Sequence, residues 1–322
     1  MIIRFLVAIS FTLHLLSCGK DPPKTEASTN QKKQIVSQNI PVYDGKRAFE
    51  YLVTQTTFGP RNPGSQGHRK CLNYLQGELQ QYADAINLQP FTHQGYDGEI
   101  LNLTNIISSF NLNATTRILL VAHWDTRPRA DENPDSSKRN QPILGANDGA
   151  SGVAVLLEIA RHLKTTPPSV GVDMLFTDGE DYGKEGDNKN YLLGARYFAS
   201  NLPKGFNPVF GILLDMVGDK QFELLKEPNS QKFAPDVVEL VWSTARELGV
   251  YQFTNGVQQD VLDDHIPLNQ AGIRTIVLID FDYPDTSNRY WHTTEDTPDK
   301  CSPESLEAVG KVLMHIIYTQ PS

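Results

Sequence analysis

The feature of this sequence that most constrains its fold is a set of strand-like segments that are apolar at nearly every position. The runs ILLVA at 118–122 and TIVLI at 275–279 are examples. A strand without polar alternation is buried on both faces, as happens in parallel sheets that helices cover on each side. The strand-like segments lie at 103–110, 118–123, 172–177, 209–216 and 275–281.

Segments with helical periodicity alternate with these strands. They lie at 45–56, 67–82, 152–163, 191–202, 235–248 and 303–318. The last begins with Ser302 at the N-cap position and Pro303 at the first helical position, a typical start for a helix. We therefore predict an α/β fold, a single-domain sandwich over residues 44–322 with a mostly parallel central sheet flanked by helices.

The N-terminal residues have a different character. An apolar run at 5–16 is shorter than the roughly 20 residues of a membrane-spanning helix, and with Arg4 before it the run is typical of a signal peptide. Residues 15–19, LLSCG, resemble the lipobox of bacterial lipoproteins, in which the cysteine is acylated after cleavage. We predict a signal peptide over 1–17 and a lipidated Cys18 with a polar, flexible tether over 18–43. The protein would be exported and membrane-anchored, facing the periplasm or at the outer membrane; an ordinary secretory signal is the alternative.

Charge and cysteine content limit the partners and the covalent links. The chain has 29 Lys+Arg against 38 Asp+Glu, a net charge of −9. A nucleic-acid binder needs a basic face to displace counterions from phosphates, so we expect no nucleic-acid partner. Cys71 and Cys301 are the cysteines besides Cys18. An exported protein can oxidise such a pair, and the sequence leaves open whether they pair or remain two buried thiols.

Acids and histidines follow four of the strand-like segments, at the strand ends where ligands bind in folds of this class. They are His123, Asp125, Glu180, Asp181, Asp215 and His292. Asp148 stands at the entry to the helical segment at 152–163, and Asp263, Asp264 and His265 precede a short helix. Each alone has an ordinary explanation as a helix cap, a strand-end acid or a surface residue. Several of them at one edge of a sheet are what a divalent ion requires. Zinc fits a mixed Asp/His set without thiolate, whereas magnesium or calcium favours an all-oxygen set.

These residues resemble the zinc aminopeptidase and glutaminyl cyclase superfamily, over about residues 44–318. Within it, the sequence is more similar to the animal-type, zinc-dependent glutaminyl cyclases. The supporting segments are RNPGS at 61–65, NIIS at 105–108, DDHIP at 263–267 and YWHT at 290–293. The resemblance implies an acyltransferase that acts on peptides or proteins with an N-terminal Gln. Such an enzyme converts that Gln to pyroglutamate and releases ammonia.

The resemblance also implies roles for individual residues. In the cyclase branch one zinc per chain is held by Asp148, Asp181 and His292, with Glu180 as the proton shuttle. Asp215 and Asp263 then hydrogen-bond to each other beside the leaving group, and Trp291 and His265 bind the substrate. In the alternative, a two-zinc aminopeptidase, Asp148 bridges two ions: His123 and Asp215 hold one, and Asp181 and His292 hold the other. Glu180 activates the bridging water.

Two residues favour the cyclase. Peptidases of this type usually carry a small neutral residue where this chain has Asp263, and cyclases place a tryptophan where it has Trp291. The non-functional alternatives are that Asp263 is a solvated acid and that Trp291 packs as an ordinary core residue. The sequence also differs from the animal enzymes at two positions. Asp181 is one methylene shorter than their Glu, and Ala122 replaces a disulfide cysteine. Loop 182–190 is either a rim of the site or a plain solvated loop. A binding lipoprotein that kept the fold without the chemistry is the non-enzymatic alternative.

Overall fold

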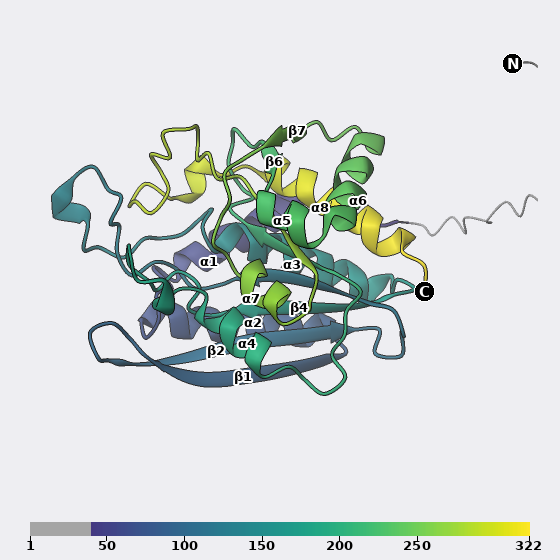
Figure 1. The fold of residues 1–322 in the computed structure, drawn as a ribbon, viewed down its shortest axis with the longest axis horizontal. Coiled ribbons are helices and arrows are strands. Elements are labelled where there is room, and N and C mark those ends of the chain that lie inside the picture. The colour runs from purple at the N-terminus through teal and green to yellow at the C-terminus, as the bar shows by residue number, and fades with distance from the viewer. Residues whose placement is uncertain (1–39) are drawn as a thin grey trace, which may run out of the picture. The chain divides into compact units, whose positions relative to one another are not determined.

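The computed structural model describes residues 40–322, and a six-stranded sheet runs through them in the order β1-β2-β4-β3-β5-β8 (Figure 1). The strands are β1 (Ala85–Gln94), β2 (Ile100–Phe110), β3 (Arg117–His123), β4 (Gly171–Thr177), β5 (Gly211–Asp215) and β8 (Thr275–Ile279). Strand β3 pairs in parallel with β4 and β5, and β5 with β8, while β1 and β2 are antiparallel to their neighbours. The predicted α/β sandwich with a mostly parallel sheet is confirmed.

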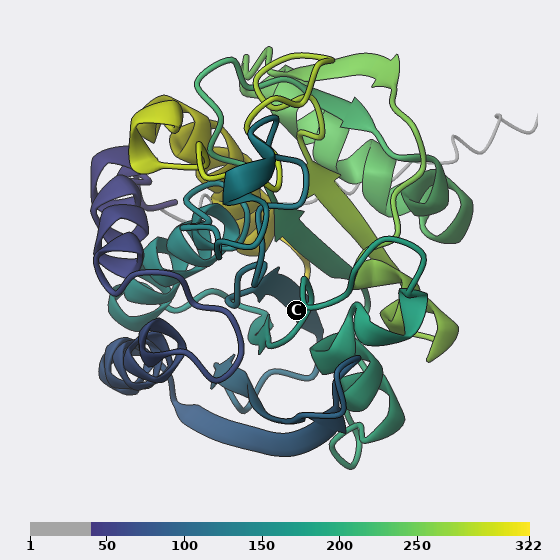
Figure 2. The same ribbon diagram turned by 90° about the vertical axis from the view of Figure 1, so that its left-hand side faces the viewer.

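Helices cover both faces of this sheet. One face carries α1 (Gly45–Thr57), α2 (Gln66–Tyr82), α3 (Ala150–Thr165), α6 (Pro235–Glu247) and α8 (Pro303–Thr319), and the other carries α4 (Leu193–Ser200) and α7 (His265–Gln270). Figure 2 shows the purple and blue helices α1 and α2 on one side of the sheet and the green segments of α4 and α7 on the other. Successive strand residues point to opposite faces. Ile118 and Leu120 therefore join the first core, and Leu119 and Val121 the second.

The structure contains elements that the apolar pattern did not predict. They are β1, the short parallel pair β6 (Leu224–Lys226) and β7 (Phe253–Val257), and α5 (Pro228–Phe233), which packs beside β8. Strand β1 lies at the edge of the sheet, is mostly exposed or half-buried, and contains Pro90. Proline is tolerated in an edge strand, where its missing N–H is not needed by a second neighbour. A strand of this kind has no continuous apolar run.

Packing of the described residues begins before the predicted boundary at Asp44. Tyr43, the last residue of the expected tether, is buried in the main core, and its ring lies against Gly310, where a Cβ would be 2.3 Å from the Tyr43 Cζ. The predicted signal peptide, Cys18 and the tether up to residue 39 lie outside the described residues. Among residues 40–322, no helix has the length and apolar content to span a membrane. Cys71 and Cys301 are both buried and free, the second of the two alternatives above.

Candidate active site

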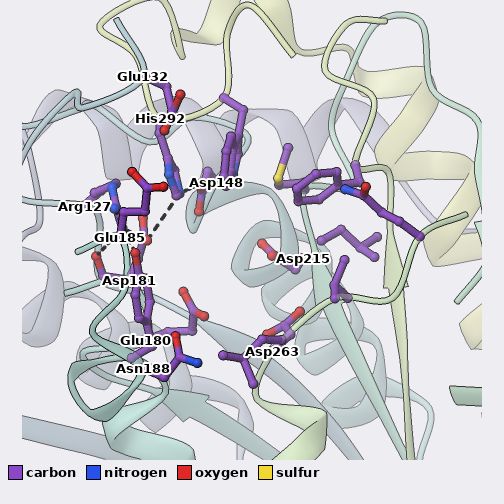
Figure 3. Close-up of a pocket in the computed structure, with 18 of the residues that line it drawn as sticks. Arg127, Glu132, Asp148, Glu180, Asp181, Glu185, Asn188, Asp215, Asp263 and His292 are labelled. Atoms are coloured by element: carbon purple, nitrogen blue, oxygen red, sulfur yellow. Dashed lines mark hydrogen bonds and ion pairs between the residues drawn. The ribbon is translucent and has the colours of Figure 1, made fainter. Parts of the chain in front are cut away.

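The carboxyl ends of the parallel strands open into a cavity of about 350 Å³. Strand β3 ends at His123, β5 ends at Asp215, and Glu180 and Asp181 follow β4. The cavity is lined on its polar side by Arg127, Glu132, Asp148, Glu180, Asp181, Glu185, Asn188, Asp215, Asp260, Asp263 and His292. Figure 3 shows that Asp181, Arg127 and His292 cluster on one side of this cavity and Asp215 and Asp263 on the other. Six of the acids and histidines singled out in the sequence therefore line one cavity, namely Asp148, Glu180, Asp181, Asp215, Asp263 and His292.

Three groups of side chains among the described residues have ligand atoms close enough to hold a metal ion, and Asp148 belongs to two of them; the third group is Glu180, Asp263 and Asp264. In the first, His292 Nε2 lies 3.3 Å from Asp181 Oδ1 and 3.5 Å from Asp148 Oδ2. In the second, His123 Nε2 lies 3.3 Å from Asp148 Oδ1 and 3.1 Å from Asp215 Oδ1. Asp148 thus presents one carboxylate oxygen to each histidine.

These separations fit zinc. In a tetrahedral site with ligand bonds of about 2.0–2.2 Å, neighbouring ligand atoms lie roughly 3.3–3.6 Å apart. The donors are carboxylates and imidazoles without thiolate, a set that zinc accepts. Asp181 Oδ2 is buried without a hydrogen-bond partner among the described residues, so the site has coordinating capacity that the protein itself does not use.

Burial and charge separate the pKa values of the two neighbouring acids after β4. Burial raises the pKa of Glu180 well above its usual range, and the nearby carboxylates of Asp181 and Asp263 add to the effect against an opposing contribution from His123. Burial acts on Asp181 in the same direction, but His292 and Arg127 beside it outweigh burial and bring its pKa below the usual range. Adjacent acids in such different environments suit different roles, a proton carrier and a charged ligand.

Two buried carboxylates, Asp125 and Asp296, fix the backbone of the candidate ligands by accepting hydrogen bonds from their N–H groups or those of their neighbours. Asp125 accepts hydrogen bonds from the N–H groups of Glu180 at 3.0 Å and Asp181 at 3.4 Å. Asp296 accepts from the N–H groups of Asn147 at 2.8 Å and Asp148 at 3.1 Å. Sequence reasoning noted Asp125 in the His-x-Asp motif but missed Asp296, because nothing in its local pattern separates it from a loop acid.

The backbone at the site adopts conformations that are costly elsewhere. His292 has φ 51° and Met216, directly after Asp215, has φ 48°, both in the left-handed region that favours glycine. Gly149, directly after Asp148, has φ 105°, and a Cβ there would lie 2.5 Å from the Asp125 carbonyl oxygen. Such residues persist only where surrounding structure enforces them, and they gather at functional sites.

Asp263 lies in the same cavity, opposite the first metal group. Its Oδ1 accepts the N–H of Asp264 at 2.5 Å, and its Oδ2 is buried without a hydrogen-bond partner in the described structure. Burial, and after it the charge of Asp215, raise the pKa of Asp263 to about 7. In the described residues Asp215 is hydrogen-bonded to His123 and no hydrogen bond joins Asp215 to Asp263, so the expected bond between the two acids stays a prediction.

Trp291 forms an apolar wall of the cavity, together with Met216, Val261, Leu262, Ile279 and Phe281. Its ring stacks on the ring of His292, with centroids 3.7 Å apart, and packs against Phe281. His265, by contrast, is fully buried at the start of α7 and is not among the residues that line the cavity. Its Nε2 lies 3.4 Å from Glu227 Oε2. The expected contact between His265 and substrate is therefore not supported, because the ring faces Glu227 rather than the cavity.

The fold and the site define a class of enzyme. Residues 105–317 match the profile of Peptidase family M28, and the chain belongs to that family. The structure resembles that of Bacteroides thetaiotaomicron glutaminyl cyclase bound to N-acetylhistamine, with 40% identity, 88% of this chain and 100% of that chain covered, and a TM-score of 0.84.

Further relatives include both exopeptidases and glutaminyl cyclases. A Zn-dependent exopeptidase from Parabacteroides distasonis is 37% identical, with 87% of this chain and 100% of that chain covered and a TM-score of 0.84. Among sequence relatives, the glutaminyl-peptide cyclotransferase of Bos taurus is 26% identical over 294 residues, with 79% of this chain and 76% of the relative covered. The resemblance to glutaminyl cyclases within the zinc aminopeptidase-like superfamily is confirmed.

Proposed function

We propose that this chain is a glutaminyl-peptide cyclotransferase that converts the N-terminal Gln of peptides or proteins to pyroglutamate and releases ammonia. The observation that carries the proposal is Asp263, a buried acid that faces the same cavity as Glu180 and the first metal group. The two-zinc aminopeptidase model assigns Asp263 no role. Similarity to bacterial and animal glutaminyl cyclases supports the same reaction.

The cavity is suited to hold a glutamine residue. The apolar wall around Trp291 would pack against the methylene groups of the side chain, and the acids opposite it would receive the α-amino group. Because the nucleophile is the substrate's own amine, the protein has mainly to hold the amine and the side-chain amide close together and to move one proton.

Glu180 is our candidate for that proton transfer. A buried carboxyl group whose pKa is raised holds a proton more readily than an ordinary Glu, which suits a group that accepts a proton from an amine and returns it to a leaving nitrogen. Asp263, whose pKa burial and the charge of Asp215 raise to about 7, would in its protonated form donate a hydrogen bond to the departing nitrogen.

The metal in this proposal is a single zinc ion held by Asp148, Asp181 and His292. Bound there, zinc would act as a Lewis acid toward the amide carbonyl. His123 and Asp215 would then hold each other through their 3.1 Å contact and would bind no second ion.

The alternative is a two-zinc aminopeptidase, which the second group of ligands and the exopeptidase relative favour. One assay separates the two reactions. Purified protein is incubated with a Gln-initiated peptide and with a Leu-initiated peptide, and the products are measured by mass spectrometry and by ammonia release. Loss of ammonia from the first peptide alone supports the cyclase; loss of the N-terminal residue from either peptide supports the aminopeptidase.

Export and lipid anchoring through Cys18 belong to the proposal as well. The support is the LLSCG segment at 15–19 after an apolar run of signal-peptide length. A membrane-anchored enzyme would meet its substrates, peptides or proteins with an N-terminal Gln, outside the cytoplasm.

A further inference from the structure

We propose that Arg127 is a positioning residue of the metal centre: it holds the short Asp181 carboxylate at ligand distance from His292. The inference rests on the zinc site of the proposed function, and it is independent of whether the enzyme cyclises or hydrolyses its substrate. Sequence reasoning did not single out Arg127, although it stands two residues after Asp125 in the same strand-end segment.

Arg127 forms two hydrogen bonds with Asp181. Its Nη1 donates to Asp181 Oδ1 at 2.7 Å and to the Asp181 carbonyl oxygen at 3.3 Å. One contact fixes the side chain and the other fixes the backbone that carries it. Oδ1 is also the Asp181 oxygen that lies 3.3 Å from His292 Nε2, and Oδ2 has no hydrogen-bond partner among the described residues. By binding Oδ1, Arg127 fixes the orientation of the carboxylate and leaves Oδ2 available to a metal ion.

Arg127 is itself held from the far side. Its Nε and Nη2 both donate to the Asp131 carboxylate at 2.6 Å, and Nη2 also donates to the Tyr191 hydroxyl at 2.9 Å. The side chain is 2% exposed. A bidentate pair of this kind fixes the plane of the guanidinium group. The chain Asp131–Arg127–Asp181 is thus a rigid brace from the loop after β3 to the metal ligand.

The support from Arg127 matters because Asp181 has a short side chain. An aspartate carboxylate lies one methylene closer to the backbone than a glutamate carboxylate, so its position depends on the backbone that Arg127 also contacts. Without Arg127, a buried carboxylate would lose its countercharge and two of the contacts that orient it. Partners that orient a metal ligand in this way typically contribute roughly 10–100-fold to metal affinity.

A purely electrostatic role predicts the opposite sign. A guanidinium beside the ligands repels a zinc ion, so its removal would tighten zinc binding if charge were the whole effect. Positioning predicts weaker binding. The two roles are therefore distinguished by the direction of the change in zinc affinity, measured on the metal-free protein without any substrate.

The experiment measures the zinc dissociation constant of the apo protein by competition with a chromophoric chelator. We expect Arg127→Met and Arg127→Lys both to weaken zinc binding by roughly 10–100-fold. Met removes the hydrogen bonds altogether, and Lys keeps the positive charge but lacks the planar guanidinium that binds Asp131 and Asp181 at once. Arg117→Met is the matched control: Arg117 donates from Nε and Nη2 to both oxygens of the Asp173 carboxylate, but it lies at the start of β3, away from the site, so zinc affinity should stay at the wild-type value. Zinc binding by Arg127→Met that equals or exceeds the wild type would overturn the proposal.

Asp181→Glu supplies an internal rescue that a structural role would not show. The longer side chain restores the reach that Arg127 supplies, so Arg127→Met should cost less zinc affinity in the Asp181→Glu background than in the wild type. Equal losses in both backgrounds would also overturn the proposal. If Arg127→Met fails to fold, Arg127→Lys in the two backgrounds gives the same comparison. Peptide hydrolysis in place of cyclisation would refute the proposed function and leave this result intact.

Discussion

His123 Nε2 lies 3.1 Å from Asp215 Oδ1, at the carboxyl ends of two adjacent parallel strands. The same nitrogen lies 3.3 Å from Asp148 Oδ1, while His292 approaches the other oxygen of Asp148. The chain therefore has the side chains for two adjacent metal positions. One occupied position corresponds to the proposed cyclase, and two correspond to the alternative aminopeptidase. A matched pair of histidines, one on each side of Asp148, allows this to be tested.

We expect one zinc ion per chain, lost in His292→Ala and retained in His123→Ala. His292 belongs to the group that holds the zinc in our proposal, whereas His123 pairs with Asp215. Elemental analysis of the purified proteins after dialysis measures the content. Two tightly bound zinc ions in the wild type, with one lost in each variant and hydrolysis of a Leu-initiated peptide, would move the assignment to the aminopeptidase.

Glu180→Gln should keep the zinc and lower kcat by at least about 100-fold, because the amide preserves size but accepts no proton. Glu185→Gln is the matched control, since Glu185 lines the same cavity but is exposed at its rim. Turnover of a Gln-initiated peptide and zinc content are measured together. Near-native turnover by Glu180→Gln would assign the proton transfer to another residue.

The fold and the ligand positions were predictable for a shared reason. Buried strands carry an unbroken apolar run, and the residues that end the run lie at one edge of the sheet, so His123 and Asp215 were visible from sequence. Strand β1 was not, because an edge strand with Pro90 and a half-exposed surface has no such run.

The residues that hold the ligands were hidden from sequence reasoning. Arg127 and Asp296 act through contacts with segments 54 and about 150 positions away along the chain, and neither has a local pattern that marks it. The role of Asp263 was assigned only through the resemblance, since its raised pKa depends on burial and on Asp215. Contacts of this kind exist only once the tertiary structure does.

Asp280→Asn should weaken the pH dependence of stability. Asp280 is buried after β8, its Oδ2 accepts the N–H of Glu223 at 2.9 Å, and burial above all raises its pKa to about 8. The pKa of an Asp side chain in the unfolded chain is about 4. A pKa that is higher in the folded state means that the stabilising contribution is complete below about pH 4 and is lost as the pH rises through about 8.

The free energy of unfolding of the wild type should therefore fall more steeply between pH 5 and 8 than that of Asp280→Asn, by urea denaturation at about three pH values. Asp282→Asn is the control, because Asp282 is exposed two residues further on. Parallel wild-type and Asp280→Asn profiles would show that Asp280 is already ionised in the folded protein.

Cys18→Ser, or a chain that starts at Gln38, should be released from membranes and remain fully active. Acyl chains contribute about 0.8 kcal/mol per buried methylene, so their loss removes the anchor. The shortened chain keeps Tyr43, which packs in the core against Gly310. Membrane fractionation and turnover of a Gln-initiated peptide are the measurements. Recovery of Cys18→Ser with the membranes would contradict the lipoprotein prediction.

Asp263→Asn tests the residue on which the choice of the cyclase depends. The change preserves shape and removes an ionisable group whose pKa is raised by burial and by the nearby charge of Asp215. In the cyclase one of these paired acids stays protonated and donates to the departing nitrogen, and the Asn variant breaks that pairing. We expect it to keep fold and zinc, because Asp263 belongs to neither metal group that contains Asp148. Turnover should fall steeply while KM changes little, the signature of an interaction made in the transition state.

Asp260→Asn is the matched control for this variant, since Asp260 is an exposed acid that lines the same cavity three residues earlier. It should leave kcat at the wild-type value, which separates the loss of one particular carboxyl group from a general loss of negative charge. The aminopeptidase gives Asp263 no task and so predicts that both variants behave alike. Measured on a Gln-initiated peptide with zinc content checked in parallel, wild-type kcat in Asp263→Asn would remove the main reason for preferring the cyclase, whereas a selective loss there would tie the reaction to a proton held between Asp215 and Asp263.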